Sequence, residues 1–327
     1  MVLLLASDLN HLYDMDMSTI LISEFITSQA LETLRFGHEV IYAPDLYKDR
    51  PALIAAMQNI DALVVRNLTQ VNEKVLIAAP KLKVVGRLGV GLENIELPAC
   101  AKRNIKVIPA TGATAESVAE YVVGAAVALT RGFIPATIET LNGGWPRPRF
   151  SGYHEFLGQT LGIVGFGSIG RVVAKKAHAF GLQCVAYDPM LSGNSVDLEG
   201  FSVPLLKLSE LLARSHAVSL HLPYLPETKN LFNATTLDQM KEGACLVNTA
   251  RGGIVDELAL AERLRSGRIG GAAIDVFAAE PAKDLSHFSG IENLILTPHI
   301  AGVTHESNER VSQMIADEVI RYLGALK

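Results

Sequence analysis

Gly165-Phe-Gly167-Ser-Ile-Gly170 is the stretch of this chain that decides its fold. It directly follows the apolar run 161–164 and directly precedes a predicted helix at 171–180. The next apolar run leads to an acidic residue, Asp188, eighteen residues beyond Gly170. A strand, a glycine-rich turn, a helix and a second strand ending in an acid are together typical of a doubly wound α/β domain that binds a dinucleotide.

The three glycines and the residues between them have separate physical tasks. Gly165 permits the tight turn, Gly167 lets the backbone approach a pyrophosphate, and Gly170 lets the helix pack closely against the strand. At the start of the helix, Ser168 and Ile169 then present N–H groups and a partial positive charge to the phosphates. A glycine turn without a ligand is the alternative, which this complete context disfavours.

The acid at the end of the second strand predicts which dinucleotide binds. Asp188 is expected to accept hydrogen bonds from the adenosine ribose hydroxyls, although a strand-end acid can also serve only as a cap. Pro189 and Met190 follow it, and no arginine lies nearby to hold a 2′-phosphate. We therefore expect NAD rather than NADP.

Short apolar runs alternate with helical segments on both sides of this motif. In the second half these runs are nearly pure Val, Ile, Leu, Ala and Cys, as expected of strands buried on both faces of a parallel sheet. Strands are predicted at 19–23, 39–43, 62–65, 83–87 and 106–109, and then at 161–165, 183–187, 217–220, 244–248, 271–276 and 294–297. Helices are predicted at 27–36, 51–59, 72–79, 114–131, 171–180 and 306–323. The fold class is therefore α/β, with two doubly wound parallel-sheet (Rossmann-like) domains.

Length, composition and charge exclude several other classes of protein. The 327 residues are 49% hydrophobic and 19% charged, which suits two globular domains. A net charge of −5 provides no basic face for nucleic acid, and no apolar stretch is long enough to span a membrane. Three widely spaced cysteines predict reduced thiols, a cytoplasmic location and no metal site. Residues 1–16 precede the first predicted strand and are expected to be a non-native or disordered extension.

Three further motifs follow strands of the second series. They are Asn248-Thr-Ala-Arg251-Gly-Gly, Asp275-Val-Phe-Ala-Ala-Glu280-Pro and Thr297-Pro-His299-Ile-Ala-Gly. Ligands of open α/β sheets bind at the carboxyl ends of the strands, so these residues are expected to converge. Taken singly, His299 would more often be a structural histidine, Arg251 a solvated charge and Glu280 part of a turn. Their joint position downstream of the glycine motif favours catalysis.

With these motifs, the chain resembles the D-isomer-specific 2-hydroxyacid dehydrogenase family from residue 19 to its C-terminus. The resemblance implies that Arg251, Glu280 and His299 form the catalytic set. It also implies a discontinuous substrate-binding domain (1–112 and 303–327), an NAD-binding domain inserted at 113–302, and a homodimer formed through the helix that starts near Thr114. The small residues of that helix could equally be buried within one chain.

The chemistry of the three residue types agrees with that resemblance. Reduction of a 2-oxo acid needs a hydride donor, a proton donor and a cation for the carboxylate. His299 can give or take a proton near neutral pH, and Glu280 would orient its imidazole. Arg251 offers a planar fork that can hold the carboxylate and polarise the carbonyl.

The resemblance also assigns supporting residues around the cofactor and the substrate. In the cofactor site it adds His221, Pro223, Thr249, Ala250 and Asp275. His221 is equally interpreted as a packing residue, and Asp275 as a support for the site. In the first domain it places substrate contacts at Arg66, Asn67, Leu88, Gly89 and Val90. Backbone N–H groups near the last three would bind the substrate carboxylate, and Arg66 would suit a second anion such as phosphate or sulfonate.

Several substrates and one different function stay open on the sequence. Hydroxypyruvate or glyoxylate, 3-phosphoglycerate and sulfolactate are the substrate classes considered, and a faint likeness around Arg66 and the preceding Ile22-Ser-Glu-Phe favours sulfolactate. A co-repressor of the same fold, which senses NAD with little turnover, is the alternative function. Formate dehydrogenase is disfavoured because it has glutamine where this chain has Glu280.

Overall fold

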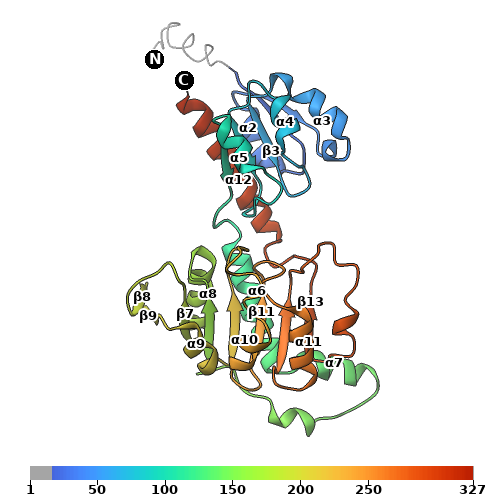
Figure 1. Ribbon diagram of the computed structural model, residues 1–327, viewed down its shortest axis with the longest axis vertical. Helices are drawn as coiled ribbons and strands as arrows, with labels where there is room; N and C mark the ends of the chain where they lie inside the picture. The colour runs from blue at the N-terminus through green and yellow to red at the C-terminus, as the bar shows by residue number, and fades with distance from the viewer. Residues whose placement is uncertain (1–16, 327) are drawn as a thin grey trace, which may run out of the picture. The chain divides into compact units, whose positions relative to one another are not determined.

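A computed structural model describes residues 17–326, so the expectation for residues 1–16 lies outside the described part of the chain. The chain divides into two compact units (Figure 1). The first runs to Thr114 and resumes at Thr304, and the second comprises Ala115–Val303. These boundaries lie within two residues of those expected from the sequence.

The first unit is built on a five-stranded parallel sheet with the strand order β2-β1-β3-β4-β5. The chain places β2 on one side of β1 and then crosses to β3 on the other, which is the doubly wound arrangement. The strands are β1 Thr19–Ile22, β2 Glu39–Tyr42, β3 Ala62–Val65, β4 Val84–Arg87 and β5 Lys106–Pro109. The helical elements are α2 Ser28–Arg35, η1 Leu46–Lys48, α3 Arg50–Ala56, η2 Met57–Asn59, α4 Glu73–Ile77, α5 Leu97–Lys102 and α12 His305–Ala325.

The C-terminal helix α12 belongs to this first unit, a point that composition left open (Figure 1). Thr304 caps its first turn by accepting the N–H of Ser307 at 3.0 Å. Its apolar face packs over β4, where Gly86 leaves room for it. A Cβ at Gly86 would lie 2.7 Å from Cγ2 of Ile315 and 2.9 Å from Cγ2 of Val319.

The second unit contains a six-stranded parallel sheet with the order β13-β12-β11-β10-β6-β7 and a separate antiparallel hairpin, β8-β9. The strands are β6 Thr160–Val164, β7 Gln183–Tyr187, β8 Ser195–Leu198, β9 Phe201–Pro204, β10 Ala217–Leu220, β11 Cys245–Asn248, β12 Gly271–Ile274 and β13 Leu294–Leu296. The helical elements are α6 Ala115–Thr130, α7 Phe133–Leu141, η3 Arg149–Gly152, α8 Ser168–Ala179, α9 Leu208–Arg214, α10 Ala234–Gln239, α11 Glu257–Arg265 and η4 Ser286–Phe288. The predicted fold class, two doubly wound parallel sheets, is confirmed.

The second unit contains two elements that the sequence did not predict and one helix whose predicted start needs correction. The hairpin β8-β9 was not expected, because its short strands are largely exposed and lack the continuous apolar runs of the buried strands. Helix α7 follows α6 directly after Gly132, whose left-handed conformation (φ 63°) separates the two helices. Helix α8 begins at Ser168 rather than at Arg171, so the last part of the glycine motif is already helical.

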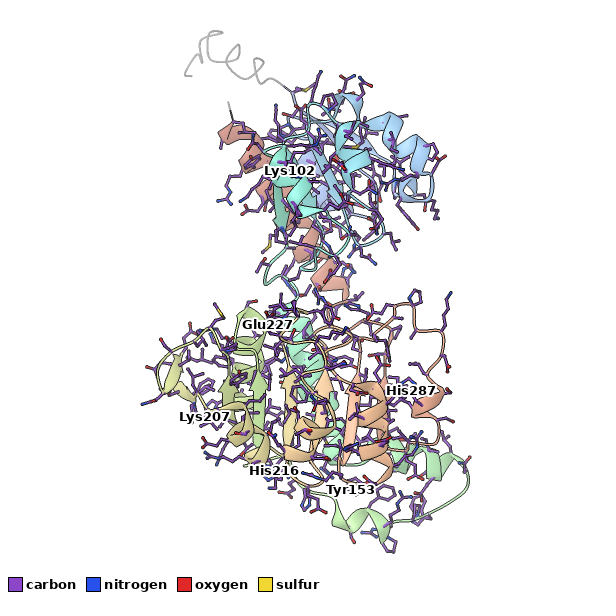
Figure 2. All side chains as sticks on the ribbon, in the orientation of Figure 1. Lys102, Tyr153, Lys207, His216, Glu227 and His287 are labelled. Atoms are coloured by element: carbon purple, nitrogen blue, oxygen red, sulfur yellow. The ribbon has the colours of Figure 1, made fainter. Side chains whose placement is uncertain are left out.

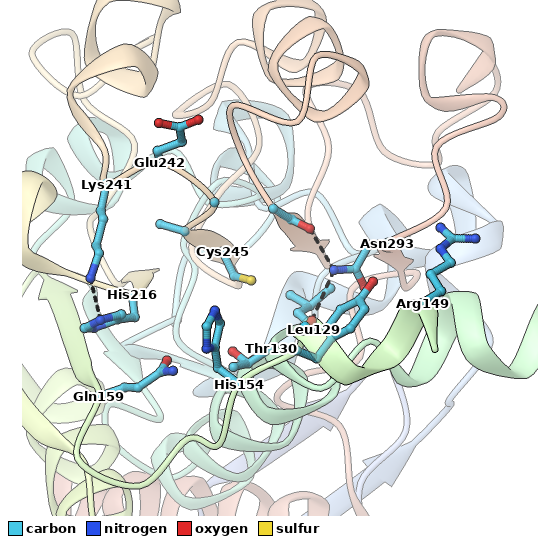
Figure 3. Close-up of a pocket in the computed structure, with 15 residues that line it drawn as sticks. Leu129, Thr130, Arg149, His154, Gln159, His216, Lys241, Glu242, Cys245 and Asn293 are labelled. Atoms are coloured by element: carbon cyan, nitrogen blue, oxygen red, sulfur yellow. Dashed lines mark hydrogen bonds between the residues drawn. The ribbon is translucent and has the colours of Figure 1, made fainter. Parts of the chain in front are cut away.

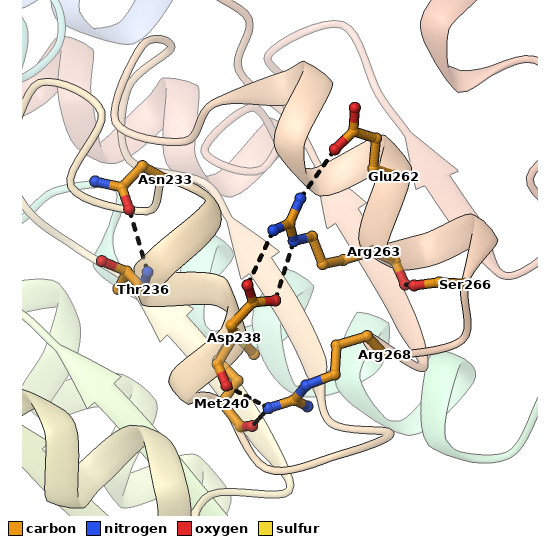
Figure 4. Close-up of polar contacts among 8 residues, drawn as sticks. All are labelled: Asn233, Thr236, Asp238, Met240, Glu262, Arg263, Ser266 and Arg268. Carbon is orange, nitrogen blue, oxygen red and sulfur yellow. Dashed lines mark hydrogen bonds and ion pairs between the residues drawn. The ribbon is translucent and has the colours of Figure 1, made fainter.

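Hydrogen bonds from two arginines connect helices α10 and α11 of this unit (Figure 4). Arg263 donates through Nε and Nη2 to the two carboxylate oxygens of Asp238, at 3.1 and 2.9 Å. Arg268 donates to the carbonyl oxygen of Asp238 at 2.6 Å and also to that of Met240. The arginine fork holds the pKa of Asp238 below its ordinary value.

The long helix of the second unit is buried within the chain. Val118, Val122, Ala126 and Leu129 on α6 all lie in its core. Among residues 17–326, no single helix is long and apolar enough to cross a membrane, although the sharply bent pair α6 and α7 passes by length and composition when taken together.

Candidate functional site

The glycine motif lies where the winding of the second sheet reverses. It follows β6, whose neighbours β7 and β10 carry the chain in opposite directions across the sheet. The N–H of His221, just after β10, donates to Val164 O at 2.7 Å. Gly165 has φ +93°, and a Cβ there would lie 2.5 Å from His221 O. This is the position at which open α/β sheets bind their ligands.

The space around the motif fits a pyrophosphate. A Cβ at Gly167 would meet no atom within 4 Å, whereas a Cβ at Gly170 would lie 2.3 Å from Gly165 O. Gly170 is therefore needed for packing, and Gly167 lies beside open space. Helix α8 begins at Ser168, and no side chain caps it among the described residues. Its first N–H groups, including that of Ile169, are thus available to an anion.

Asp188 is held at the edge of this loop. Its Oδ2 accepts the N–H of Phe166 at 2.8 Å, and its Oδ1 accepts the N–H of Met190 at 2.9 Å. The carboxylate thereby connects the glycine turn to the end of β7. Each oxygen keeps a second lone pair that a ribose hydroxyl could use, and the exposed Met190 provides no positive charge for a 2′-phosphate.

The remaining predicted cofactor residues follow β10 and β11. His221 is partly buried, its Nε2 lies 3.1 Å from Ser219 Oγ, and burial lowers its pKa to about 3. It is therefore neutral at physiological pH. Pro223 is exposed, and Thr249 has a buried hydroxyl without a partner among the described residues. Their contacts with a cofactor stay predictions.

The three motifs predicted to be catalytic converge at the carboxyl ends of β11, β12 and β13. Backbone hydrogen bonds continue past the strands: Asp275 N–H donates to Asn248 O at 3.0 Å, and Thr297 N–H donates to Ile274 O at 3.1 Å. His299 N–H then donates to Asp275 O at 2.8 Å. This pairing brings together residues that are far apart in the sequence, as the motif spacing predicted.

Arg251 lies on a loop that is packed tightly against the Glu280 motif. A Cβ at Gly252 would lie 1.7 Å from Phe277 O, so only glycine allows the two loops to meet. Asn248 fixes the turn through Nδ2, which donates to Arg251 O at 3.2 Å, and through Oδ1, which accepts the N–H of Ala250 at 3.1 Å. The Arg251 guanidinium donates to Ala250 O at 2.7 Å.

His299 and Glu280 form a direct pair. Nδ1 of His299 lies 2.7 Å from Oε2 of Glu280, whose Oε1 accepts the N–H of Phe277 at 3.0 Å. The carboxylate thus selects the imidazole tautomer with a proton on Nδ1. The His299 side chain is 49% exposed, and within residues 17–326 no contact engages its Nε2. This nitrogen is therefore available to a bound molecule.

A buried chain of hydrogen bonds, which the sequence did not reveal, holds the His299 loop. Asp275 is 1% exposed and accepts the N–H groups of Ile300 and Ala301 at 2.8 and 2.9 Å. It also accepts Thr297 Oγ1–H at 2.6 Å, and that oxygen lies 2.6 Å from the Tyr121 hydroxyl. Asp275 therefore supports the His299 loop, which is one of the two roles that the sequence suggested for it. Its predicted contact with the cofactor stays untested.

The first unit contains the predicted substrate residues, and Arg66 among them is held firmly. Its Nη2 donates to Oδ1 of Asn308 at 2.6 Å, and its guanidinium lies 5.5 Å from the centre of the Phe25 ring. The backbone N–H of Arg66 donates to the buried carboxylate of Glu24 at 2.8 Å. Burial lowers the pKa of Arg66 below its ordinary value. Neighbouring Asn67 is exposed.

The predicted carboxylate-binding amides need correction. Leu88 N–H already donates to Val65 O at 2.8 Å, and Gly89 N–H donates to Arg87 O at 2.8 Å. These two amides are therefore occupied within the fold. Among the described residues no hydrogen bond engages the amide of Val90, the third residue predicted, so its contact with a carboxylate stays a prediction.

Comparisons with known proteins agree with this architecture. The family model of the D-isomer specific 2-hydroxyacid dehydrogenase, NAD-binding domain, matches residues 123–301. An (S)-sulfolactate dehydrogenase of Chromohalobacter salexigens is 46% identical over 308 residues, covering 94% of this chain and 99% of that protein. A D-3-phosphoglycerate dehydrogenase of Mycobacterium leprae is 38% identical over 93% of this chain, which spans only 57% of that relative. The crystal structure of the TT0316 protein from Thermus thermophilus has a TM-score of 0.82 at 31% identity, covering 94% of this chain and 97% of that one.

Proposed function

This chain belongs to the D-isomer specific 2-hydroxyacid dehydrogenase family, and we propose that His299 is its general acid/base in NAD-dependent hydride transfer at C2 of a 2-hydroxy acid. As a member of that family it is an NAD-dependent dehydrogenase, which confirms the predicted cofactor. The observation that carries the proposal is the 2.7 Å contact between His299 Nδ1 and Glu280 Oε2, which leaves Nε2 for the substrate.

In the direction of reduction, the protein supplies a proton and a positive charge. Bound NADH supplies the hydride. The imidazolium form of His299, protonated on both nitrogens, donates through Nε2–H to the substrate carbonyl oxygen and transfers that proton as the oxygen gains negative charge, which leaves a neutral ring with its proton on Nδ1. Glu280 accepts Nδ1–H throughout, which fixes the orientation of the ring. Arg251 attracts the same oxygen and the neighbouring carboxylate, so it favours the charge that develops during the reaction.

The substrate side supports a 2-hydroxy acid with a second anionic group, and among these we favour sulfolactate. Arg66 is a cation whose position is set by Asn308 and Phe25 before any ligand binds. A planar guanidinium matches the oxygens of a sulfonate or phosphate. The 46% identity to a relative named (S)-sulfolactate dehydrogenase, over nearly its full length, favours the sulfonate.

A substrate screen with a charge-removing variant tests this choice. NADH oxidation would be followed with sulfopyruvate, 3-phosphohydroxypyruvate, hydroxypyruvate, glyoxylate and pyruvate. We expect the highest kcat/KM with sulfopyruvate, and a loss of about tenfold to a hundredfold in Arg66→Ala for that substrate. Hydroxypyruvate, which lacks the second anion, should lose much less.

Arg35→Ala is the matched control, because Arg35 is a surface residue of the same unit that pairs only with Glu32 in the described structure. Equal losses for hydroxypyruvate and sulfopyruvate in Arg66→Ala would contradict a role in reading the second anion. Tight NADH binding without turnover of any 2-oxo acid would instead favour the NAD-sensing co-repressor.

Replacement of the proposed acid/base tests the mechanism separately. His299→Ala should lower kcat by roughly a hundredfold to ten-thousandfold, because no other group would give the proton. NADH affinity, measured by fluorescence titration, should change little. His305→Ala removes an exposed histidine and should leave kcat unchanged. Turnover by His299→Ala at the rate of the unaltered enzyme would rule out the assignment.

We further propose that the chain forms a homodimer, but through a different segment from the one predicted. The apolar face of α6 is buried within its own unit, so it is not free for a partner. Exposed apolar side chains gather instead on and after α7, where Leu141 and Trp145 are 81% and 82% exposed. Such a patch is typical of an interface. The proposed cytoplasmic location rests on three buried free thiols, Cys100, Cys184 and Cys245.

A further inference from the structure

A cavity of about 480 Å³ lies at the end of the second sheet opposite the candidate active site (Figure 3). The residues just before four parallel strands line it, among them Gln159, His216, Ala244 and Gly270. Figure 2 shows His216 at the end of this unit that lies away from Glu227, which follows β10. The cavity is thus separate from the glycine motif and from His299.

Basic side chains gather at one end of this cavity. His154, His216 and Lys241 all line it, and Figure 3 shows His216 and Lys241 in contact. Arg149 also lines it but is already paired with two carboxylates, those of Glu139 and Glu292. Lys241 therefore provides a positive charge that no carboxylate already pairs, and the two histidines provide ring nitrogens beside it.

At the contact between His216 and Lys241, neither nitrogen can accept a hydrogen bond from the other. The backbone N–H of Thr160 donates to His216 Nδ1 at 3.0 Å, so Nδ1 must carry a lone pair. The ring proton is then on Nε2, which lies 2.6 Å from Lys241 Nζ. Because an ammonium group has only donors, two donors face each other there. With the lysine side chain turned slightly away from the ring, an oxygen atom that bridges the two nitrogens would accept from both.

Among the described residues, no carboxylate accepts a hydrogen bond from both His216 and Lys241. Glu242 also lines the cavity, but Figure 3 shows its carboxylate turned away from His216. The charges that act on His216 are those of Lys241 and His154. Together with burial, which is the larger cause, they lower the pKa of His216. Within the described chain, no acidic group is thus among the charges that act on His216.

We propose that this cavity binds a small oxyanion, phosphate or a phosphate monoester, with one oxygen that bridges His216 and Lys241 from the cavity and with the others within reach of His154. Lys241 would contribute a charge-assisted hydrogen bond, and Nε2–H of His216 would contribute a second. The volume exceeds that of a single phosphate, so a small organic group attached to the phosphate also fits.

Binding of inorganic phosphate to the full-length enzyme tests the proposal. Isothermal titration at pH 7.5, at constant ionic strength set with chloride and with saturating NADH, keeps phosphate away from the cofactor site. We expect saturable binding that weakens about tenfold in Lys241→Met. His154→Gln should weaken it to a smaller extent. Glycerol 3-phosphate, titrated in the same way, shows whether a monoester binds more tightly than the free anion.

Lys207→Met is the matched control, because it removes one exposed cation from the same unit but outside the cavity (Figure 2). NADH affinity and far-ultraviolet circular dichroism identify any variant that is misfolded. Phosphate binding that is absent in the unaltered enzyme, or that is the same in Lys241→Met and Lys207→Met, would overturn the proposal. Neither result bears on the dehydrogenase activity, which does not involve this cavity.

Discussion

His299, the proposed acid/base, has an unusual backbone conformation. Its φ is +57°, in the left-handed region that side chains other than glycine seldom adopt. The surrounding structure enforces this conformation, since its N–H donates to Asp275 O and Thr297 O at 2.8 and 3.0 Å. Strained residues of this kind occur where the neighbouring contacts determine the position of a functional side chain. The conformation therefore supports the proposed role of His299.

His221 should make the stability of the protein depend on pH. Burial lowers its folded-state pKa to about 3, compared with about 6.5 in an unfolded chain. Between these values the unfolded chain binds a proton that the folded protein does not, so the free energy of unfolding falls as the pH falls. In His221→Gln, this decrease should be shallower by about 1 kcal/mol per pH unit.

Urea denaturation between pH 4.5 and pH 7.5 measures this slope. His305→Gln removes an exposed histidine and should leave the slope as it is. Parallel curves for His221→Gln and the unaltered protein would show that His221 is not held neutral by its burial.

At the scale of elements, α6 determines the position of the His299 loop through one hydroxyl. Tyr121 on this helix contacts Thr297, which donates to Asp275 beneath the loop. Tyr121→Phe removes one buried hydrogen bond, so we expect kcat to fall about fivefold. The affinity for NADH should not change, because the glycine motif is elsewhere on the sheet.

Steady-state kinetics with both substrates separates these two effects. Tyr322→Phe, on α12 in the other unit, is the matched control and should keep the original kcat. A Tyr121→Phe enzyme with unchanged kcat, or one that loses kcat and NADH affinity together, would not fit a positioning role.

The packing of α12 on β4 depends on the absence of a side chain at Gly86. In Gly86→Ala the new Cβ would contact branched, buried side chains of Ile315 and Val319 at less than normal separation. We expect the free energy of unfolding to fall by about 1–3 kcal/mol.

Gly124→Ala provides a control of opposite sign. Gly124 lies within α6, and a Cβ there would meet no atom within 4 Å. Because alanine favours a helix, this change should stabilise the protein by up to about 1 kcal/mol. If the urea midpoints of both variants shifted in the same direction, the explanation that Gly86 leaves room for α12 to pack on β4 would be contradicted.

At the scale of the whole molecule, the proposed homodimer predicts a change in mass. Light scattering after gel filtration should give twice the chain mass for the unaltered protein. Replacing Leu141 and Trp145 together by serine should give the mass of one chain, because both apolar side chains leave the interface. Phe36→Ser removes an equally exposed apolar residue from the other unit and should not change the mass. A monomeric unaltered protein would refute the proposal.

Most of the fold could be predicted from the sequence, because parallel strands buried on both faces must be continuous apolar runs. The runs at β3 and β10, whose residues are all buried, agree with the structure to the residue, and so do the predicted bounds of the edge strands β5 and β7. Hairpin β8-β9 could not be predicted, since its exposed strands contain no such run. The candidate catalytic residues could also be named, because each follows a strand and the topology brings strand ends together.

The fold class, the glycine motif and the residues for the proposed chemistry could all be named from the amino-acid sequence, because strands, turns and motifs leave patterns within short stretches of the chain. Only the tertiary structure decided the partners of those residues. Tyr121 contacts Thr297 across 176 positions, and Arg66 contacts Asn308 across 242. It also showed that the amides of Leu88 and Gly89 are already occupied. The physical reason is that a hydrogen bond depends on distance in space, and separation along the chain does not reveal that distance.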